Sequence, residues 1–189
     1  MRTIHEPRSV PRVGELEQSR VLRDEAVFAD PLVTELLGAR LVGVLATFDP
    51  AGAIHAIPMW YASHDGAVLL ATSARSRKVG NLETDPRATL VVHDSRPGYE
   101  VCGASIVGSV EVVRAPAAQP LIDRVQGRYV ATEAAVDDPT ALSFLQSDDV
   151  ALRFTPASAS TWDHRASEGS RILRTHGWAR PLVTTDPRA

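Results

Sequence analysis

Apolar runs of strand length alternate with short polar turns along the middle of the chain. The runs cover residues 41–48, 53–61, 67–72, 88–93 and 99–113, and residues 150–155 add a last run in which apolar and polar positions alternate. Turn signals such as Asp49-Pro50 and Asp65-Gly66 separate the first three runs, and connections this short force neighbouring strands to pair antiparallel. The pattern predicts about six antiparallel strands in close meander order.

Helical spacing of apolar residues occurs between and around these strands. It predicts helices over residues 15–28, 31–38, 76–84, 116–130 and 140–145. Asp30 followed by Pro31 is a typical helix start, because aspartate caps free amide groups and proline fits the first helical position. Gly38 is suited to ending that helix.

One domain accounts for this pattern. Residues 14–163 hold all the predicted strands and form the predicted domain, residues 1–13 are interpreted as a flexible arm, and residues 164–189 as a polar tail. Gly103 and Gly108 lie in the longest apolar run and indicate bulges or tight corners. We therefore expect a mainly β (α+β) fold, with a closed or half-closed barrel and peripheral helices.

Composition excludes several classes of function. The formal net charge is -3, whereas a general nucleic-acid binder has a basic excess, so nucleic acid is not expected as a partner. The single cysteine, Cys102, excludes an intrachain disulfide and a cysteine-rich zinc site, and the six histidines show no metal-ligand spacing, so no metal is expected. No apolar run is long enough to span a membrane, and the N-terminus lacks the apolar segment of a secretory signal. We expect a cytoplasmic protein without membrane attachment.

A basic turn follows the third predicted strand. Residues 72–78 read Thr-Ser-Ala-Arg-Ser-Arg-Lys, in which Ser76 is a candidate N-cap and Lys78 is the only lysine of the chain. Cations at the N-terminus of a helix oppose the helix dipole, which favours anions there. A bound anion, most commonly phosphate, would account for these cations, and a solvated basic helix start would account for them as well. The residues alone leave both interpretations open.

Several segments, taken in order, resemble one family. They are Gly-Val-Leu-Ala-Thr at residues 43–47, Gly-x-x-His-x-x-Pro-x-Trp at 52–60, Thr-x-x-x-Ser-Arg-Lys-x-x-Asn-Leu at 72–82, Asp-Pro-Arg at 85–87, the long run with Gly108, and the last strand followed by Trp162. With these segments the chain resembles the flavin and deazaflavin split-barrel proteins related to pyridoxamine 5'-phosphate oxidase.

The resemblance implies a six-stranded antiparallel split β-barrel that pairs as a homodimer, with two cofactor sites at the subunit interface. It assigns the cofactor phosphate to the basic turn, at Thr72, Ser76, Arg77 and Lys78, with Ser73 and Arg75 as nearby candidates. It places the cofactor ring along the second strand, beside His55, Ala56, Ile57 and Pro58. The phosphate position agrees with the anion site inferred above from the residues.

The resemblance also limits the cofactor and the reaction. The oxidase itself has a C-terminal Arg-Leu-His-x-Arg type of segment for pyridoxal phosphate, and the tail here lacks it. Oxidation of pyridoxamine phosphate is therefore not expected. Similarity to the branch that binds coenzyme F420 slightly favours F420 over FMN, and haem is a minor alternative.

An oxidoreductase is the expected function, moving hydride between the bound deazaflavin or flavin and a small organic substrate. The cofactor performs the difficult step in such enzymes, so no catalytic side chain is assigned. His55, His93 and Tyr99 are candidates by chemistry alone and are more simply structural. A non-catalytic flavin- or haem-binding carrier or sensor of the same fold is the alternative.

Overall fold

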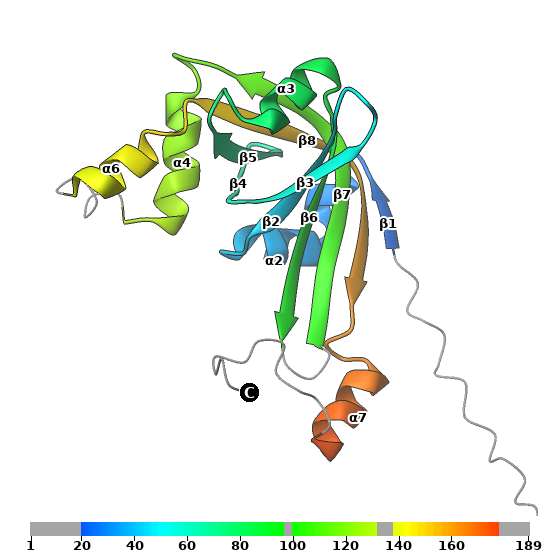
Figure 1. Cartoon of the computed structure of the whole chain (residues 1–189). Helices are drawn as coiled ribbons and strands as arrows, with labels where there is room; N and C mark the ends of the chain where they lie inside the picture. The colour runs from blue at the N-terminus through cyan, green and yellow to red at the C-terminus, as the bar shows by residue number, and fades with distance from the viewer. Residues whose placement is uncertain (1–19, 97–99, 132–137, 178–189) are drawn as a thin grey trace, which may run out of the picture.

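The chain is built around one antiparallel sheet. The computed structural model describes residues 20–96, 100–131 and 138–177. Within these ranges eight strands pair in the order β3-β2-β6-β7-β8-β5-β4, and β1 pairs with β8. The strands are β1 (Arg20–Arg23), β2 (Gly43–Phe48), β3 (Ile54–Met59), β4 (Ala62–His64), β5 (Ala67–Thr72), β6 (Arg87–Arg96), β7 (Glu100–Val113) and β8 (Val150–Asp163) (Figure 1). The predicted mainly β class with peripheral helices is confirmed.

The strand order differs from the predicted meander. β5 and β6 follow one another in the chain but are not neighbours, because α3 (Arg77–Thr84) intervenes and β6 pairs with β2. β8 in turn pairs with β5. The predicted count of six strands is too low, since β4 lies largely in residues assigned to a turn and β1 lies in residues assigned to a helix.

The helix predicted over residues 15–28 is wrong in most of its described part. β1 occupies four of those residues and pairs with β8, and only Ala26–Ala29 is helical, as α1. Asp24 between them has a positive φ of 50°, which a helix interior does not contain. Beyond its pairing with β5, β8 offers β1 a free edge, so tertiary pairing outweighs the local helical spacing. The predicted arm over residues 1–13 lies outside the described residues.

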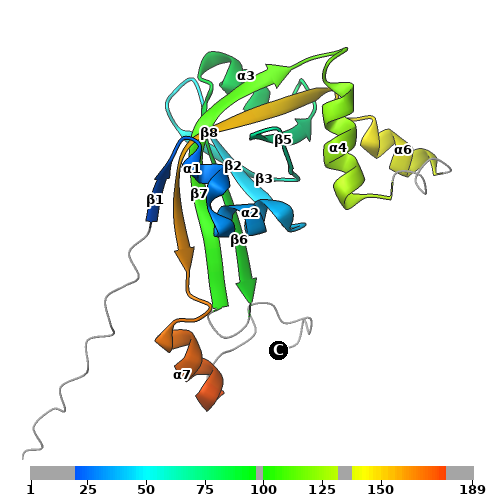
Figure 2. The same ribbon diagram turned by 180° about the vertical axis from the view of Figure 1, so that it is seen from behind.

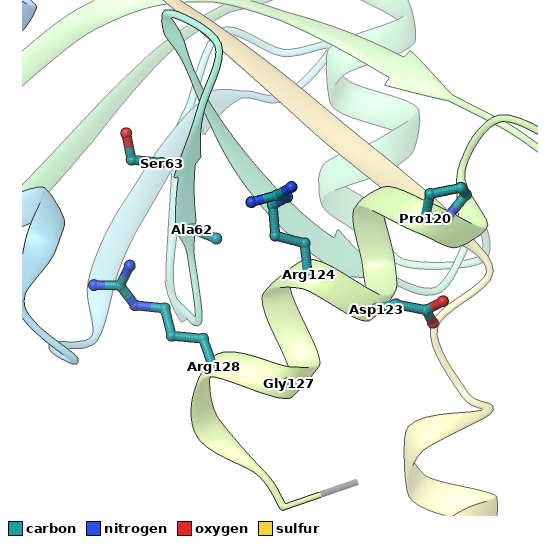
Figure 3. Close-up of a pocket in the computed structure, with 7 residues that line it drawn as sticks. All are labelled: Ala62, Ser63, Pro120, Asp123, Arg124, Gly127 and Arg128. Atoms are coloured by element: carbon teal, nitrogen blue, oxygen red, sulfur yellow. The ribbon is translucent and has the colours of Figure 1, made fainter.

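Helices cover the sheet and its ends. α2 (Pro31–Gly38) lies on one face of the sheet (Figure 2), and it starts as predicted, because the Asp30 carboxylate accepts two first-turn backbone hydrogen bonds at 3.0 and 3.2 Å. α4 (Gln119–Tyr129) runs beside β4 (Figure 3), and α6 (Pro139–Leu145) follows it. No helix in the described ranges is long and apolar enough to cross a membrane.

The C-terminal segment contains more structure than the predicted polar tail over residues 164–189. Glu168–His176 forms α7. Arg174 on this helix pairs with Glu100 at the start of β7. α7 therefore lies beyond the ends of β6, β7 and β8 (Figure 1). Residues 178–189 lie outside the described part of the chain.

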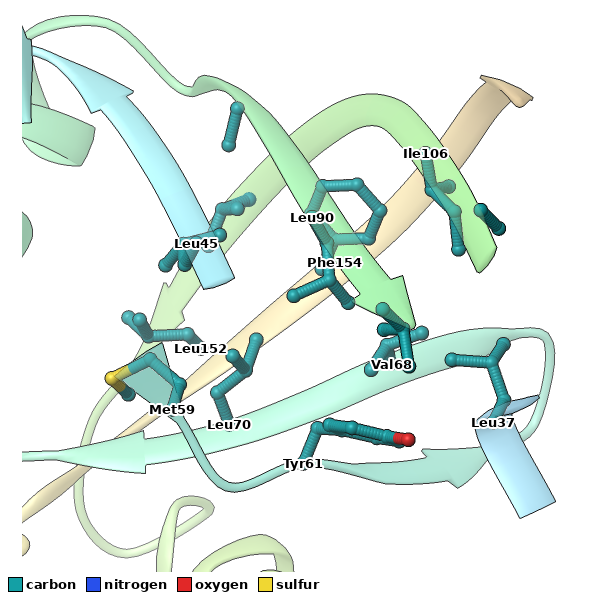
Figure 4. Packing of buried hydrophobic residues seen from close by; sticks show 14 of the residues in the cluster. Leu37, Leu45, Met59, Tyr61, Val68, Leu70, Leu90, Ile106, Leu152 and Phe154 are labelled. Carbon is teal, nitrogen blue, oxygen red and sulfur yellow. The ribbon is translucent and has the colours of Figure 1, made fainter. Parts of the chain in front are cut away.

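The core lies inside the curved sheet. Fully buried side chains from five strands meet there (Figure 4), namely Leu45, Val68, Leu70, Leu90, Ile106, Leu152 and Phe154. The two strands at the ends of the sheet, β3 and β4, are joined in the chain by Trp60 and Tyr61 alone. The buried Tyr61 hydroxyl donates a hydrogen bond to the carbonyl of Leu36 at 2.7 Å, which ties this corner of the sheet to α2.

Two glycines allow β7 and β8 to pack closely. The register between these strands shifts between Val107 and Gly108, so the predicted irregularity at Gly108 is confirmed. A Cβ at Gly108 would lie 2.2 Å from the carbonyl oxygen of Thr155, and one at Gly103 would lie 2.2 Å from the Trp162 ring. Glycine fits at both points because any side chain there would overlap β8.

Candidate functional site

Three of the residues predicted to bind phosphate are in contact at the end of β5. Thr72 is the last residue of β5, Ser76 precedes α3, and Lys78 lies in the first turn of α3. The Lys78 ammonium group donates a hydrogen bond to Thr72 Oγ1 at 2.8 Å, and Thr72 Oγ1 lies 3.4 Å from Ser76 Oγ. These contacts gather two hydroxyl groups and one ammonium group at the start of a helix.

The Lys78 ammonium group is buried without a paired carboxylate. The residue is 8% exposed, and among the described residues Thr72 is its hydrogen-bond partner and no carboxylate lies within ion-pairing distance. Burial lowers the pKa of Lys78, and the more distant charge of Asp148 opposes this shift. Because a buried charge is costly unless it is paired, the arrangement suits an added anion.

The N-terminus of α3 would attract the same anion. Ser76 occupies the N-cap position, yet its side chain accepts no hydrogen bond from the helix, and the first turn holds no acidic residue. The first amide groups of a helix have no partner inside the helix and carry the positive end of its dipole. An anion beside Lys78 would take the place that a capping side chain fills in other helices.

The two arginines predicted for this turn are placed differently. Arg77 forms an ion pair with Asp49 at 2.7 Å. Asp49 lies in the turn between β2 and β3, where its carboxylate also accepts hydrogen bonds from the N–H groups of Ala53 and Ala51, and these contacts lower the pKa of Asp49. Arg77 thus joins the basic turn to the start of β3 and still has N–H groups for an anion. Arg75 is exposed on the outside of the turn.

Ser73 and Asp149 stabilise the shape of the basic turn through hydrogen bonds with its backbone. Ser73 Oγ accepts a hydrogen bond from the N–H group of Arg75 at 3.4 Å. Asp149, which precedes β8, donates its N–H group to the Thr72 carbonyl at 3.1 Å, and its carboxylate accepts a hydrogen bond from the N–H group of Ala74. Sequence reasoning missed Asp149, because its contact depends on the pairing of β5 with β8.

The strand predicted to lie along the cofactor ring, β3, is one end of the sheet. Ile54, Ala56 and Pro58 are exposed, and His55 and Ile57 alternate with them and are half-buried. An end strand presents unpaired backbone N–H and C=O groups along its outer side, and proline is tolerated there because it lacks an N–H group. β3 therefore offers unpaired backbone polar groups, and beside them the exposed side chains of Ala56 and Pro58, to a flat ligand.

His55 is connected to α3 through buried hydrogen bonds. The His55 carbonyl accepts a hydrogen bond from Thr47 Oγ1 at 3.4 Å, and Thr47 Oγ1 accepts one from the Asn81 side-chain amide at 3.0 Å. The imidazole of His55 has a buried Nδ1 atom with no hydrogen-bond partner among the described residues. Sequence reasoning missed Thr47 and Asn81; the available signal was a polar residue, Asn81, beside the buried Leu82 of α3. The basic turn and β3 are thus parts of one connected arrangement.

The other candidate residues show simpler roles. His93 Nδ1 lies 2.9 Å from Ser95 Oγ on the exposed part of β6, and Tyr99 lies outside the described residues. Cys102 is buried, and burial raises the pKa of its thiol. In the part of the chain that the structure describes, no group of three or more His, Cys, Asp or Glu residues could hold a metal ion.

The architecture of the sheet agrees with comparisons with known proteins. A sequence model of the family described as pyridoxamine 5'-phosphate oxidase matches residues 29–163. That range contains β2 to β8, the basic turn and α3. A comparison with curated proteins finds no match.

Solved structures with a similar fold cover most of the chain. A conserved hypothetical protein of Mycobacterium tuberculosis is 27% identical with a TM-score of 0.61, and the match covers 91% of this chain and 99% of that one. An FAD-binding protein of Mesorhizobium loti is 21% identical with a TM-score of 0.54, covering 76% and 98%. A haem storage protein of Vibrio cholerae is 14% identical with a TM-score of 0.54, covering 71% and 95%. With the family match over residues 29–163 and this shared architecture, the chain belongs to the pyridoxamine 5'-phosphate oxidase family, and its curved antiparallel sheet is a split barrel.

Proposed function

We propose that this protein is an oxidoreductase that moves hydride between a phosphate-bearing deazaflavin or flavin and a small organic substrate. The observation that carries the proposal is the buried Lys78 ammonium group, which has Thr72 Oγ1 at 2.8 Å and no paired carboxylate among the described residues. A cofactor phosphate supplies the missing negative charge. The sequence resemblance slightly favours F420 over FMN, and both molecules carry such a phosphate.

The basic turn binds the phosphate in this proposal. Lys78, Thr72 and Ser76 donate hydrogen bonds to its oxygens together with the first N–H groups of α3, and Arg77, Arg75 and Ser73 surround it from the outer side. A hydrogen bond to a charged group contributes about 1.5–3 kcal/mol. Because Lys78 and Thr72 are already in contact, little side-chain entropy is lost when the phosphate binds.

β3 orients the ring in this proposal. His55, Ala56, Ile57 and Pro58 lie beside it, and the outer backbone groups of the end strand meet its polar edge. The bound flavin or deazaflavin supplies the hydride chemistry. The chain holds the ring against the sheet and excludes water from one of its faces, and the Thr47 hydrogen bond fixes the backbone at His55.

A second copy of the chain completes the proposed site. Ile54 on β3 is 71% exposed, and Phe48, its direct partner across the β2–β3 pair, is 36% exposed. Large apolar side chains gathered on an open sheet edge are suited to burial against another protein surface. The proposed assembly is a homodimer with a cofactor at each end of the interface, and light scattering of the purified protein measures its mass.

Cofactor titration and turnover test the proposed function. Purified full-length protein is titrated with F420 and with FMN, and we expect saturable binding of at least one of them. The reduced cofactor complex is then mixed with a panel of quinones and enones, and we expect reoxidation faster than by dissolved oxygen. Failure to bind either cofactor would overturn the proposal.

A carrier or sensor of flavin or haem is the second candidate. The imidazole of His55 favours it, since it has no hydrogen-bond partner among the described residues and histidine is a common haem ligand. The haem storage protein of Vibrio cholerae shares the fold. A Soret band on adding haem, or tight cofactor binding without reoxidation by any acceptor, would favour this candidate over the oxidoreductase.

A further inference from the structure

A hollow lies between β4 and α4 (Figure 3). Its volume is about 580 Å³. It is lined by Ala62 and Ser63 from β4 and by Pro120, Asp123, Arg124, Gly127 and Arg128 from α4. These residues include none from the basic turn or from β3, so the hollow is separate from the site described above.

The hairpin of β4 and β5 determines which backbone groups face the hollow. Asp65 and Gly66, the two turn residues, both have positive φ, at 46° and 69°, as in a type I' turn. His64 and Ala67 are therefore the hydrogen-bonded pair next to the turn. In the next pair the N–H and C=O groups of Ser63 point away from β5, at the free edge of the sheet.

Two residues before Ser63, a side chain of α4 already binds a backbone group at this edge of the sheet. The N–H group of Tyr61 donates a hydrogen bond to the hydroxyl of Tyr129 at the end of α4, at 3.3 Å. Alternate residues of a strand direct their backbone groups to the same side, so the N–H group of Ser63 faces α4 as well. No hydrogen bond from Ser63 to another side chain or loop is present in the described chain. A ligand oxygen could accept a hydrogen bond from the N–H group of Ser63, as the Tyr129 hydroxyl does from the N–H group of Tyr61.

Arg128 supplies a fixed positive charge at the hollow. Its guanidinium group donates hydrogen bonds to the carbonyl oxygens of Leu37 at 2.9 Å and Ala39 at 2.5 Å, and it lies over the Tyr61 ring at 5.4 Å. Its buried Nε atom has no hydrogen-bond partner among the described residues. Carbonyl oxygens bear no full charge, so the positive charge of Arg128 is not neutralised by these contacts.

Arg124 supplies a second charge one helical turn away. Its side chain extends from α4 toward β4 in Figure 3, and it has neither a hydrogen bond nor an ion pair with the residues that the structure describes. The acidic residue of the lining, Asp123, accepts a hydrogen bond from Gln119 at 2.8 Å. With two arginines and one carboxylate, the lining of the hollow carries a net positive charge.

Gly127 keeps the space between the two arginines open. A Cβ at this position would meet no atom within 4 Å, so packing does not require glycine. Glycine inside a helix costs about 1 kcal/mol relative to alanine. The missing side chain leaves room beside Arg124 and Arg128 for a bound group.

We propose that this hollow binds the oxyanion group, a carboxylate or a phosphate, of a small molecule. In this proposal the Arg124 guanidinium group and the N–H group of Ser63 bind the oxyanion, and the fixed positive charge of Arg128 attracts it. Arginine recognises both kinds of oxyanion through paired N–H groups. This site requires neither the proposed cofactor nor hydride transfer.

Amide NMR on the full-length protein tests the site residue by residue. The protein is titrated with sodium phosphate and, separately, with sodium succinate, and sodium chloride at matched ionic strength is the reference. We expect saturable shifts at the amides of residues 62–64 and 123–128 that chloride does not produce. Binding at the basic turn is distinguished by its own amides, at residues 73–78.

Two variants test the residues without disturbing the fold. Arg124→Gln removes a charge that holds no other part of the protein, and we expect about a tenfold or greater loss of affinity at the hollow. Gly127→Leu fills the hollow with a residue that favours helix, and we expect the same loss. Arg171→Gln, at an exposed arginine of α7 paired with Glu168, is the matched control and leaves the affinity unchanged.

The two anions also identify the kind of ligand. Tighter binding of phosphate supports a phosphorylated ligand, and tighter binding of succinate supports a carboxylic acid. The proposal is overturned if neither anion produces saturable shifts at the hollow, if chloride produces the same shifts, or if Arg124→Gln binds as the unmodified protein does.

Discussion

Asn81 donates a hydrogen bond from its side-chain amide to Thr47 Oγ1 at 3.0 Å, and the two residues are 3% and 2% exposed. Asn81 lies on α3, the helix that starts at the basic turn, and Thr47 lies on β2 directly opposite His55 of β3. Thr47 Oγ1 also lies 3.4 Å from the His55 carbonyl oxygen. This buried polar pair therefore fixes the position of the proposed phosphate site relative to β3, the strand proposed to lie beside the cofactor ring.

Replacing Asn81 by alanine should destabilise the protein, because it leaves Thr47 Oγ1 buried with one partner fewer. We expect Asn81→Ala to lower the free energy of unfolding by about 1–3 kcal/mol, measured by urea denaturation. Thr84→Ala on the same helix is the control, since its exposed hydroxyl bonds only to the Gly80 carbonyl, and we expect a change within about 0.5 kcal/mol. Equal effects of the two substitutions would contradict the importance of the buried pair.

Gly108 tests the close approach of β7 and β8. Alanine there would place Cβ 2.2 Å from the Thr155 carbonyl oxygen, and backbone must move to relieve this overlap. We expect Gly108→Ala to lower the free energy of unfolding by about 1–3 kcal/mol. Gly127→Ala, where a Cβ meets nothing within 4 Å, should instead raise it by up to about 1 kcal/mol. Thermal denaturation measures both, and a stabilising Gly108→Ala would show that the two strands can separate freely.

Asp148 should make stability depend on pH. Burial raises the pKa of Asp148 above its ordinary value of 3.8, against the opposing effects of the Gln126 hydrogen bond and the Lys78 charge. Between 3.8 and the raised value the folded state binds more protons than the unfolded state, so this residue lowers stability as the pH rises through that window.

Asp148→Asn removes this titration and keeps an oxygen for Gln126. We expect the variant to be more stable than the unmodified protein at neutral pH, with the difference shrinking as the pH falls and vanishing below about 3.8. Urea denaturation across the pH range measures it, with Asp123→Asn on the exposed side of α4 as the control. A difference that stays constant with pH would mean that packing rather than ionisation causes it.

The strands of the core were predictable because each is a continuous apolar run. Residues 67–72, for example, are apolar up to Thr72, and β5 has the same bounds. The second half of β8 was not predictable. Residues 156–161 are mostly small and polar, because this part of the strand pairs with β7 and β1 and contributes little to the core. β1 was not predicted either, because it forms only by pairing with β8, which is distant in sequence.

The candidate site likewise contains residues that could be predicted from the local sequence and residues that only the fold brings together. Thr72, Ser76 and Lys78 lie within one turn of chain, so their contact follows from a strand, a turn and a helix start in succession. Asp149 reaches the same region through the pairing of β8 with β5, and Thr47 reaches it through the packing of α3 against β2. Local sequence therefore indicates the charge of the site, and the fold supplies the residues that hold it in place.

Lys78→Met separates anion binding from folding. Methionine keeps the length and packing of the side chain but removes the buried ammonium group, whose burial is costly without a counter-ion. In the absence of cofactor we therefore expect the free energy of unfolding to stay the same or to rise, measured by urea denaturation. Affinity for F420 or FMN, measured by fluorescence titration, should fall about tenfold or more, because a charge-assisted hydrogen bond of about 1.5–3 kcal/mol is lost.

The two measurements together decide what Lys78 does. Arg171→Met, at an exposed arginine far along the chain on α7, is the control and should change neither value. A large loss of stability in ligand-free Lys78→Met protein, with cofactor affinity unchanged, would mean that the ammonium group serves the Thr72 contact and that the phosphate lies elsewhere. Retained stability with lost affinity would mean that the protein carries a buried, uncompensated charge for the sake of its ligand, because folding alone would favour the apolar side chain at this position.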